Sequence, residues 1–108
     1  MGTVEMIVLF LLEKKDLYGY ELTSLIKKLS QGKLLITESS LYPTLYKLLN
    51  NGYISDTEKT IGKRRIRVYY HLEDAGKDRL NDLLEDYREI TEGISGILSC
   101  KEISVEED

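Results

Sequence analysis

Residue types that build specialised sites are scarce in this chain of 108 residues. Cys100 is the only cysteine, so an internal disulfide is excluded and we expect an inert thiol. His71 is the only histidine, which leaves too few ligands for a zinc site of the usual kind. Pro43 is the only proline, and tryptophan is missing. We therefore expect no metal and no redox-active cysteine.

Long hydrophobic runs are also missing. The longest apolar run, Met6–Leu12, is too short for a bilayer, whose crossing takes about 20 residues. It follows Glu5 directly, without a basic leader or a small-residue cleavage site. We expect a cytoplasmic protein that makes no membrane contact.

No group of residues predicts catalysis. The chain has no glycine-rich phosphate loop, and no serine or cysteine nucleophile with a histidine nearby in sequence. Carboxylates are frequent from Asp74 onward, but pairs such as Asp82 with Asp86 recur along a predicted helix and are better explained by solvation. We expect a protein that is not an enzyme and has no cofactor.

Charge is divided unevenly along the chain. The net charge is −4, but residues 1–72 hold 11 Lys and Arg against 7 Asp and Glu, whereas residues 73–108 hold 4 against 12. A polyanion responds to the local potential, which is screened over about 10 Å at 0.1 M salt. The first part can therefore bind DNA while the acidic part faces away.

The most basic segment is Lys59–Leu72, KTIGKRRIRVYYHL, which holds five cations and no carboxylate. Two extended runs, Ile54–Lys59 and Arg64–Leu72, flank a turn at 61–63 in which Gly62 can take a positive φ. In the second run Ile66, Val68, Tyr70 and Leu72 alternate with Arg65, Arg67, Tyr69 and His71. This alternation predicts a hairpin whose apolar face holds Tyr70 in the core, while Tyr69 is exposed beside the arginines.

Three short helices are predicted before this hairpin. Thr3 is a plausible cap for an apolar helix over Val4–Leu12, and an amphipathic pattern covers Gly19–Leu29. The third helix begins near 37–40 and ends at 50–52, and Pro43 favours a start near Ser39 because proline is best tolerated in a first turn. The surface opposite its leucines can donate to phosphates and base edges through Ser39, Ser40, Tyr46 and Lys47, with Tyr42 on the flank.

The longest helical pattern runs from Asp74, its expected cap, to about Leu98. Its apolar positions follow a heptad spacing that needs a partner surface, and they are Leu80, Leu83, Leu84, Tyr87, Ile90, Ile94 and Ile97. Three helices, a two-stranded wing and a long helix form a mainly α protein of the winged helix-turn-helix type with a small β wing. We assign residues 1–73 to a DNA-binding domain and 74–108 to a dimerisation helix with an acidic tail.

Three segments resemble the PadR-like family of transcriptional regulators. They are GYEL at Gly19–Leu22, SSLYPTLYKLLNNGYI at Ser39–Ile54 and RRIRVYYHLEDAGKDRL at Arg64–Leu80, and the length is similar to that of the compact subgroup with one C-terminal helix. The chain departs from the pattern at Gly62 and Lys63, where members often carry a proline.

The resemblance implies a homodimeric, usually repressing, regulator that binds double-stranded DNA. It implies that the DNA contacts of the recognition helix come from Ser39, Ser40, Tyr42, Tyr46 and Lys47. It implies that those of the wing come from Lys63, Arg64, Arg65 and Arg67, and that the long helix forms the dimer interface. Tyr69 joins this set because of its place beside the arginines. Many members bind small aromatic effectors near the dimer interface, but this chain lacks a tryptophan platform, so an effector is left open.

Two other interpretations stay open at this stage. The acidic C-terminal part fits a winged-helix module that binds a protein partner. A sensor of small aromatic compounds is compatible with DNA binding and needs a cavity in the dimer, which Tyr87 could line, although packing in the interface is the commoner role for such a residue.

Overall fold

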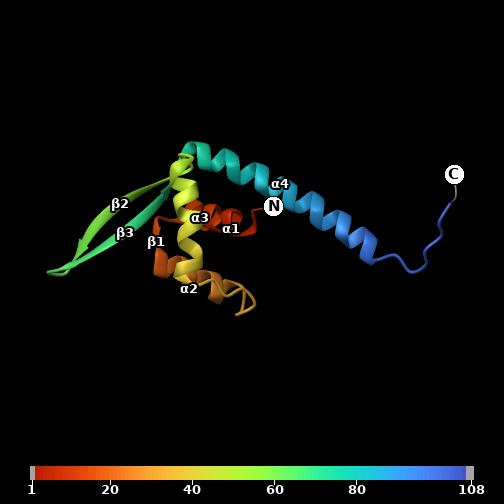
Figure 1. Ribbon diagram of the computed structural model, residues 1–108, viewed down its shortest axis with the longest axis horizontal. Helices are drawn as coiled ribbons and strands as arrows, with labels where there is room; N and C mark the ends of the chain where they lie inside the picture. The colour runs from red at the N-terminus through yellow and green to blue at the C-terminus, as the bar shows by residue number, and fades with distance from the viewer. Residues whose placement is uncertain (1, 107–108) are drawn as a thin grey trace.

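The computed structural model describes residues 2–106, and Figure 1 shows a helical body from which a hairpin and a long helix project in different directions. The elements in chain order are α1 (Thr3–Lys14), β1 (Leu17–Tyr18), α2 (Gly19–Leu29), α3 (Glu38–Asn50), β2 (Ile54–Ile61), β3 (Arg65–Leu72) and α4 (Asp74–Leu98). The predicted order of three helices, a wing and a long helix is confirmed.

The core lies where the four helices and the base of the wing meet. Its fully buried side chains come from α1, α2, α3 and α4, and they are Val8, Leu9, Leu22, Leu41, Leu45, Leu48 and Leu80. Tyr70 and Leu72 of β3 close the core at the sheet. The leucine spacing of α3 therefore places one face inward, and the opposite face remains free.

Helix α3 begins at Glu38, one residue before the start favoured by Pro43. Thr37 caps it, because its Oγ1 accepts the Ser40 N–H at 3.2 Å. Pro43 thus lies inside the helix, where it cannot donate to the carbonyl one turn back. The helix ends as predicted, with Gly52 at φ +72 and the Tyr53 N–H donating to Leu48 O at 3.0 Å.

The sheet has three strands, not the two that the sequence predicted. Its order is β1-β3-β2, and the short strand β1 pairs Leu17 with Tyr70 and Tyr18 with Tyr69. A two-residue strand carries no periodic pattern, which is why the sequence did not reveal it. Because β1 pairs with β3 and leads directly into α2, it holds the start of α2 against the base of the wing.

The wing itself is a long antiparallel hairpin. Its register runs from Ile54 paired with Leu72 to Ile61 paired with Arg65. The turn falls at 62–64, one residue later than predicted, and Gly62 takes a φ of +63 there, as expected. The tip projects beyond the helices, so Ile66 is 64% exposed and not buried on an apolar face.

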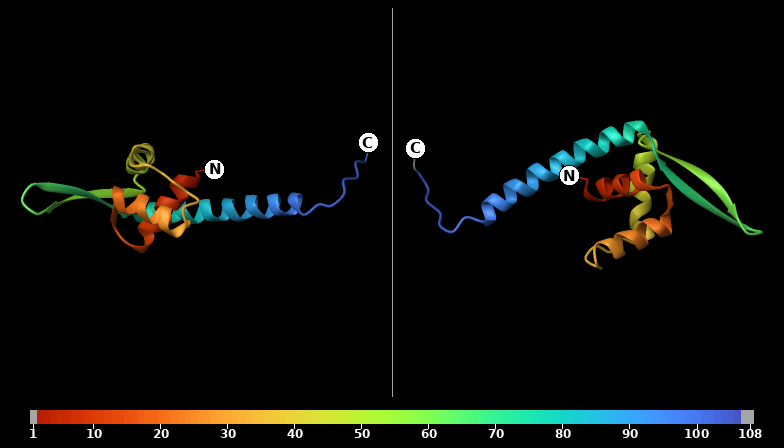
Figure 2. Two further views of the ribbon diagram at one scale, coloured as in Figure 1. Left: turned by 90° about the horizontal axis from the view of Figure 1, so that it is seen from below. Right: turned by 180° about the vertical axis from the view of Figure 1, so that it is seen from behind.

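Helix α4 is joined to the base of the wing without a linker. The Glu73 N–H donates to Tyr53 O at 3.0 Å, and a Cβ at Gly76 would collide with the same carbonyl group. Glu73 is the N-cap residue in place of Asp74, just as Gly2 precedes α1 in place of Thr3. The far half of α4 leaves the body, which gives the molecule extents of 71 × 29 × 21 Å (Figure 2).

Candidate nucleic-acid interface

The free face of α3 carries two neighbouring tyrosines. The rings of Tyr42 and Tyr46 stack at 6.3 Å between centroids with an interplanar angle of 28°. Tyr46 is 60% exposed, and Tyr42 is exposed on the side that faces the wing. Both rings therefore present flat surfaces and hydroxyl groups outside the core, as the sequence predicted.

The two predicted serines at the start of α3 are engaged locally. Thr37 Oγ1 lies 3.1 Å from Ser39 Oγ and donates to Ser40 Oγ at 3.0 Å. Both serines are exposed, but part of their hydrogen-bonding capacity is used to build the cap.

Lys47 is held by a carboxylate that no sequence pattern predicted. Its Nζ lies 3.8 Å from a carboxylate oxygen of Glu5, a residue of α1 that is only 5% exposed. Arg79 of α4 donates its Nε–H to the other oxygen of Glu5 at 2.9 Å, and this hydrogen bond raises the pKa of the guanidinium. One buried carboxylate thus connects α1, α3 and α4, and Lys47 remains mostly exposed at the edge of this cluster.

One face of the wing is a ladder of cations and aromatic rings. Lys59 Nζ lies 4.5 Å from the centroid of Tyr69, and the guanidinium carbon of Arg67 lies 4.3 Å from that of Tyr18. The rings of Tyr18 and Tyr69 meet edge to face at 5.3 Å. Tyr69 is therefore half-buried between these neighbours and not exposed as predicted, because β1 covers one side of it.

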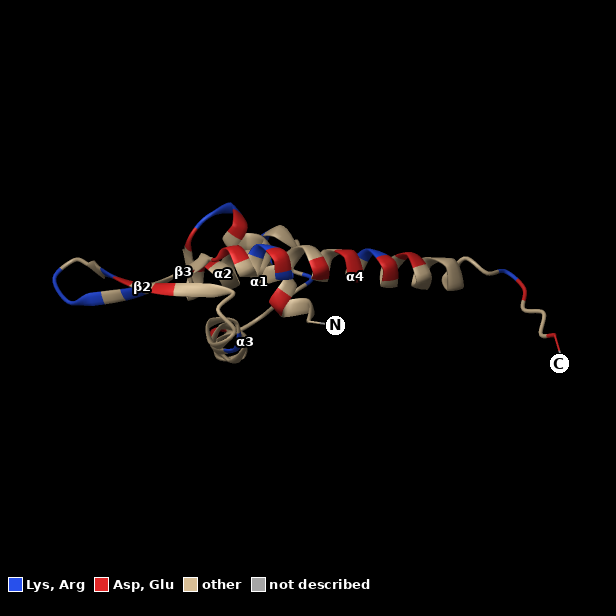
Figure 3. Ribbon diagram, turned by 90° about the horizontal axis from the view of Figure 1, so that it is seen from above, with Lys and Arg blue, Asp and Glu red and all other residues tan. Residues whose placement is uncertain are grey.

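The remaining wing cations lie at and beside the turn. Lys63, Arg64 and Arg65 are exposed there, and Figure 3 shows them as a basic tip at one end of the molecule. His71, at the base of the same face, is exposed as expected, and its Nδ1 lies 2.7 Å from a carboxylate oxygen of Asp16. The cations are thus gathered far from the acidic helix α4.

The heptad positions of α4 fall into two groups. Leu80 and Leu83 are 0% and 2% exposed in the core of their own protomer, so these two predicted interface residues are unavailable to a second copy. Leu84 is half-buried at the edge of the core. Beyond it the apolar stripe is exposed, through Tyr87, Ile90, Ile94 and Ile97.

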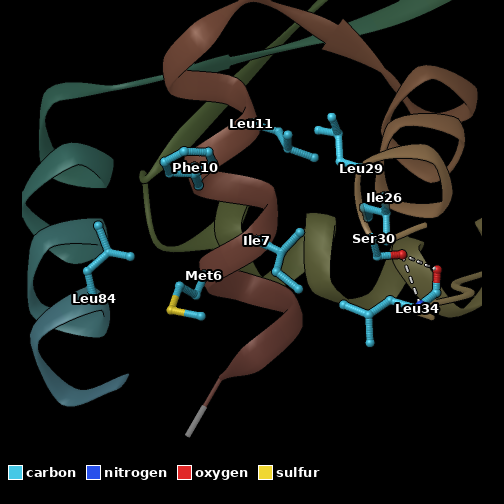
Figure 4. Close-up of a pocket in the computed structure, with 9 residues that line it drawn as sticks. All are labelled: Met6, Ile7, Phe10, Leu11, Ile26, Leu29, Ser30, Leu34 and Leu84. Atoms are coloured by element: carbon cyan, nitrogen blue, oxygen red, sulfur yellow. Dashed lines mark hydrogen bonds between the residues drawn. The ribbon is translucent and has the colours of Figure 1, made fainter. Parts of the chain in front are cut away.

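An apolar groove lies beside this stripe. It has a volume of about 300 Å³ and is formed by α1, the end of α2 and the start of the free stripe on α4 (Figure 4). Met6, Phe10, Leu29, Leu34 and Leu84 line it, and Ser30 Oγ closes one end by accepting the Leu34 N–H at 3.0 Å. Exposed apolar surface of this extent, continuous with a heptad stripe, is typical of a protein interface.

Residues 2–106 contain no cluster of His, Cys, Asp and Glu suited to a metal ion. In the same part of the chain, no helix has both the length and the hydropathy required to cross a bilayer.

The sequence profile of the "Transcriptional regulator PadR-like family" matches residues 8–82, which include the second half of α1, helices α2 and α3, the wing and the start of α4. The chain belongs to this family. Bacillus subtilis (strain 168) has a relative named "Negative transcriptional regulator PadR", which is 32% identical over 94 residues. That alignment covers 87% of this chain and 52% of the relative, so this PadR-like chain spans about half the length of that protein.

Solved structures of other PadR-like regulators have the same architecture. A transcriptional regulator from Clostridium thermocellum has a TM-score of 0.81 and 29% identity, covering 92% of this chain and 95% of the other. Bacillus subtilis PadR, solved in complex with operator DNA, has a TM-score of 0.69 and 27% identity, covering 96% of this chain and 51% of the other. The winged-helix fold predicted from the sequence is therefore confirmed.

Proposed function

We propose that this PadR-like protein is a homodimeric repressor whose α3 helices and wings bind a pseudo-palindromic DNA operator. The main support is its similarity to Bacillus subtilis PadR, a negative regulator that was solved with operator DNA and aligns over 96% of this chain. The aligned region includes α3 and the wing, which are the two elements that contact DNA in winged-helix proteins.

The distribution of charge supports contact with DNA through the wing. Five cations gather on the outer part of the hairpin, and the exposed ones at its tip are free to reach phosphates. Each neutralised phosphate contributes about −0.9 to the slope of log K against log salt. The wing therefore supplies a sequence-tolerant, salt-dependent part of the affinity.

The recognition helix supplies the selectivity in this proposal. Tyr42, Tyr46 and Lys47 stand on the free face of α3, where hydroxyl and ammonium groups can donate to base edges or phosphates. Ser39 and Ser40 contribute less to base reading than these three, because their hydroxyl groups also serve the Thr37 cap.

Dimerisation is inferred from two apolar surfaces that lack a partner within the protomer. One is the far half of α4, with Tyr87, Ile90, Ile94 and Ile97 exposed, and the other is the groove of about 300 Å³ beside α1. Two copies related by a twofold axis can bury both surfaces at once. Such a dimer carries two α3 helices, which read half-sites about 34 Å apart if they enter successive major grooves.

Selection of bound duplexes from a random pool tests the function directly. We expect an enriched site with twofold symmetry whose retention weakens steeply with salt. If no duplex is bound at low or moderate salt, the proposal fails and the acidic surface of α4 favours a module that binds a basic protein partner.

A further inference from the structure

A second groove, of about 450 Å³, separates α3 from the wing. Its walls come from the β1–α2 junction, the wing-facing side of α3, and the face of the hairpin opposite the basic ladder. Its volume is within the range of about 300 to 1,000 Å³ that is usual for small-molecule sites.

The lining is rich in tyrosine. The stacked pair Tyr42 and Tyr46 forms the α3 side, and the exposed Tyr20 stands at the start of α2. Gly19, at the junction of β1 and α2, also lines the groove. The result is a concave surface with several aromatic faces, to which Leu49, Ile66 and Val68 add aliphatic side chains.

The charge of this groove differs from that of the rest of the wing. Glu38 of α3 and Asp56 of β2 both line it, and neither forms an ion pair with a Lys or Arg of residues 2–106. Glu38 accepts only a long hydrogen bond, from the hydroxyl of Tyr42 at 3.5 Å. The one cation in the lining, Arg67, has its guanidinium over the ring of Tyr18. The two unpaired carboxylates therefore disfavour a phosphate beside Glu38 and Asp56 inside this groove.

The hydroxyl of Tyr70 lines the groove and is open to it, since no fully buried side-chain oxygen or nitrogen of residues 2–106 lacks a hydrogen-bond partner. Tyr70 is 5% exposed, and its hydroxyl forms no hydrogen bond with any residue in the described part of the chain. Burial, followed by the proximity of Tyr42 and Asp56, raises its pKa to about 12. The hydroxyl is thus protonated at neutral pH and free to bond a ligand.

We propose that the groove between α3 and the wing binds a small aromatic cation, which stacks on Tyr42 and Tyr46 and is held by Glu38 and Asp56. Aromatic faces and unpaired carboxylates are the two groups that attract organic cations. Because Tyr42 and Tyr46 also belong to the surface proposed for DNA, the cation and DNA exclude each other. That second part rests on the proposed function, whereas the ligand site itself does not.

Calorimetric titration of the full chain without DNA tests the site, with 1-methylquinolinium as the cation and 1-naphthoate as an anion of similar shape. We expect the cation to bind at least about tenfold more tightly than the anion, because a ligand charge of −1 in place of +1 turns attraction to both carboxylates into repulsion. Glu38→Gln and Asp56→Asn should each lower the affinity for the cation about tenfold, while the affinity for the anion stays unchanged or rises.

Glu58→Gln is the matched control, because Glu58 lies on the same strand and the same face but outside the groove. Equal affinity for the two probes overturns the proposal, as does cation binding that survives both carboxylate changes. Loss of binding in Phe10→Ser alone would also overturn it, since the site would then be the apolar groove beside α1.

Competition is measured separately on an operator duplex. At a cation concentration of ten times its dissociation constant, the apparent dissociation constant for DNA should rise about 11-fold. An unchanged value overturns mutual exclusion but leaves the ligand site standing. Cation binding by a protein that binds no duplex refutes the proposed function alone. A change of preferred bases in Glu38→Gln, with no cation binding, means that the groove reads DNA and holds no ligand.

Discussion

The wing and the far half of α4 both project from the helical body, yet their surfaces are opposites. The wing tip displays Lys63, Arg64 and Arg65 with few apolar groups, whereas α4 exposes an apolar stripe. Figure 3 shows the basic tip and the Asp and Glu residues along α4 at opposite ends of the molecule. Neither region buries its own end against the protomer. A cationic projection suits a polyanion, and an apolar projection suits another protein surface. The comparison indicates that each projection is completed by a different partner.

The largest effect should come from the part of α4 that does not project. Leu80→Ala removes a fully buried side chain and should lower the free energy of unfolding by about 2 to 5 kcal/mol. Ile97→Ala, at a position 74% exposed, should leave protomer stability nearly unchanged while weakening association. Urea denaturation at several protein concentrations separates the effect on protomer stability from the effect on association. A large loss of unfolding free energy for Ile97→Ala in dilute protein would contradict the view that only the first part of α4 belongs to the protomer core.

A charge placed in the exposed apolar stripe tests whether α4 binds a second copy of the chain. Ile94→Asp should convert the dimer to monomers, because an aspartate cannot be buried between apolar helices without a partner. DNA affinity should then fall about 100-fold, since the two half-sites are no longer bound as one event. Sedimentation velocity and mobility shifts measure the two effects. Glu92→Gln, on the same helix, is the control, and a dimeric Ile94→Asp protein would refute this interface.

The wing and α3 can be distinguished by their salt dependence. Arg65→Ala should weaken binding to all duplexes similarly and reduce the salt slope by about 0.9 for each bound wing. Tyr46→Ala should instead change the preference among duplexes and leave the slope nearly unchanged. Binding curves at several salt concentrations, with Lys101→Ala as an exposed control, test this division. The reverse assignment would reject it.

The smallest effect concerns the buried base of the wing at high pH. Because the pKa of Tyr70 is raised from 10 to about 12, the unfolded chain loses this proton first as pH rises. The stability from the buried, protonated phenol is therefore complete below pH 10 and declines between pH 10 and 12. Tyr70→Phe should show a shallower decline in denaturation midpoint than the parent, and equal slopes would contradict this role.

Most of the fold was predictable because it depends on local patterns. The leucine spacing of α3 and the alternation in β3 identified the elements, and Gly62 identified the turn. The heptad spacing of α4, however, is the same at Leu80 and at Ile94, although one is buried in its own protomer and the other is exposed. Spacing shows that a surface needs a partner but not which chain supplies it.

In the candidate site, sequence patterns could predict only features that arise within one helix or one strand. The buried carboxylate of Glu5 meets Arg79 across 74 positions of sequence, and no local pattern pairs them. Asp56 belongs to the same hairpin as the wing cations but lies on the opposite face, toward α3. The half-burial of Tyr69 similarly depends on the two-residue strand β1. Such features depend on contacts that only the folded chain brings together.

The close contact between Tyr53 and Gly76 joins the first turn of α4 directly to the base of the wing. The 25 residues of α4 span about 37 Å at 1.5 Å per residue. Leu80 and Leu83 hold its first part in the core, so a bend of about 5° near Leu84 would carry the end at Leu98, about 21 Å away, by about 2 Å. A small change where α4 leaves the core would therefore become a larger displacement at the apolar stripe that we propose as the dimer contact.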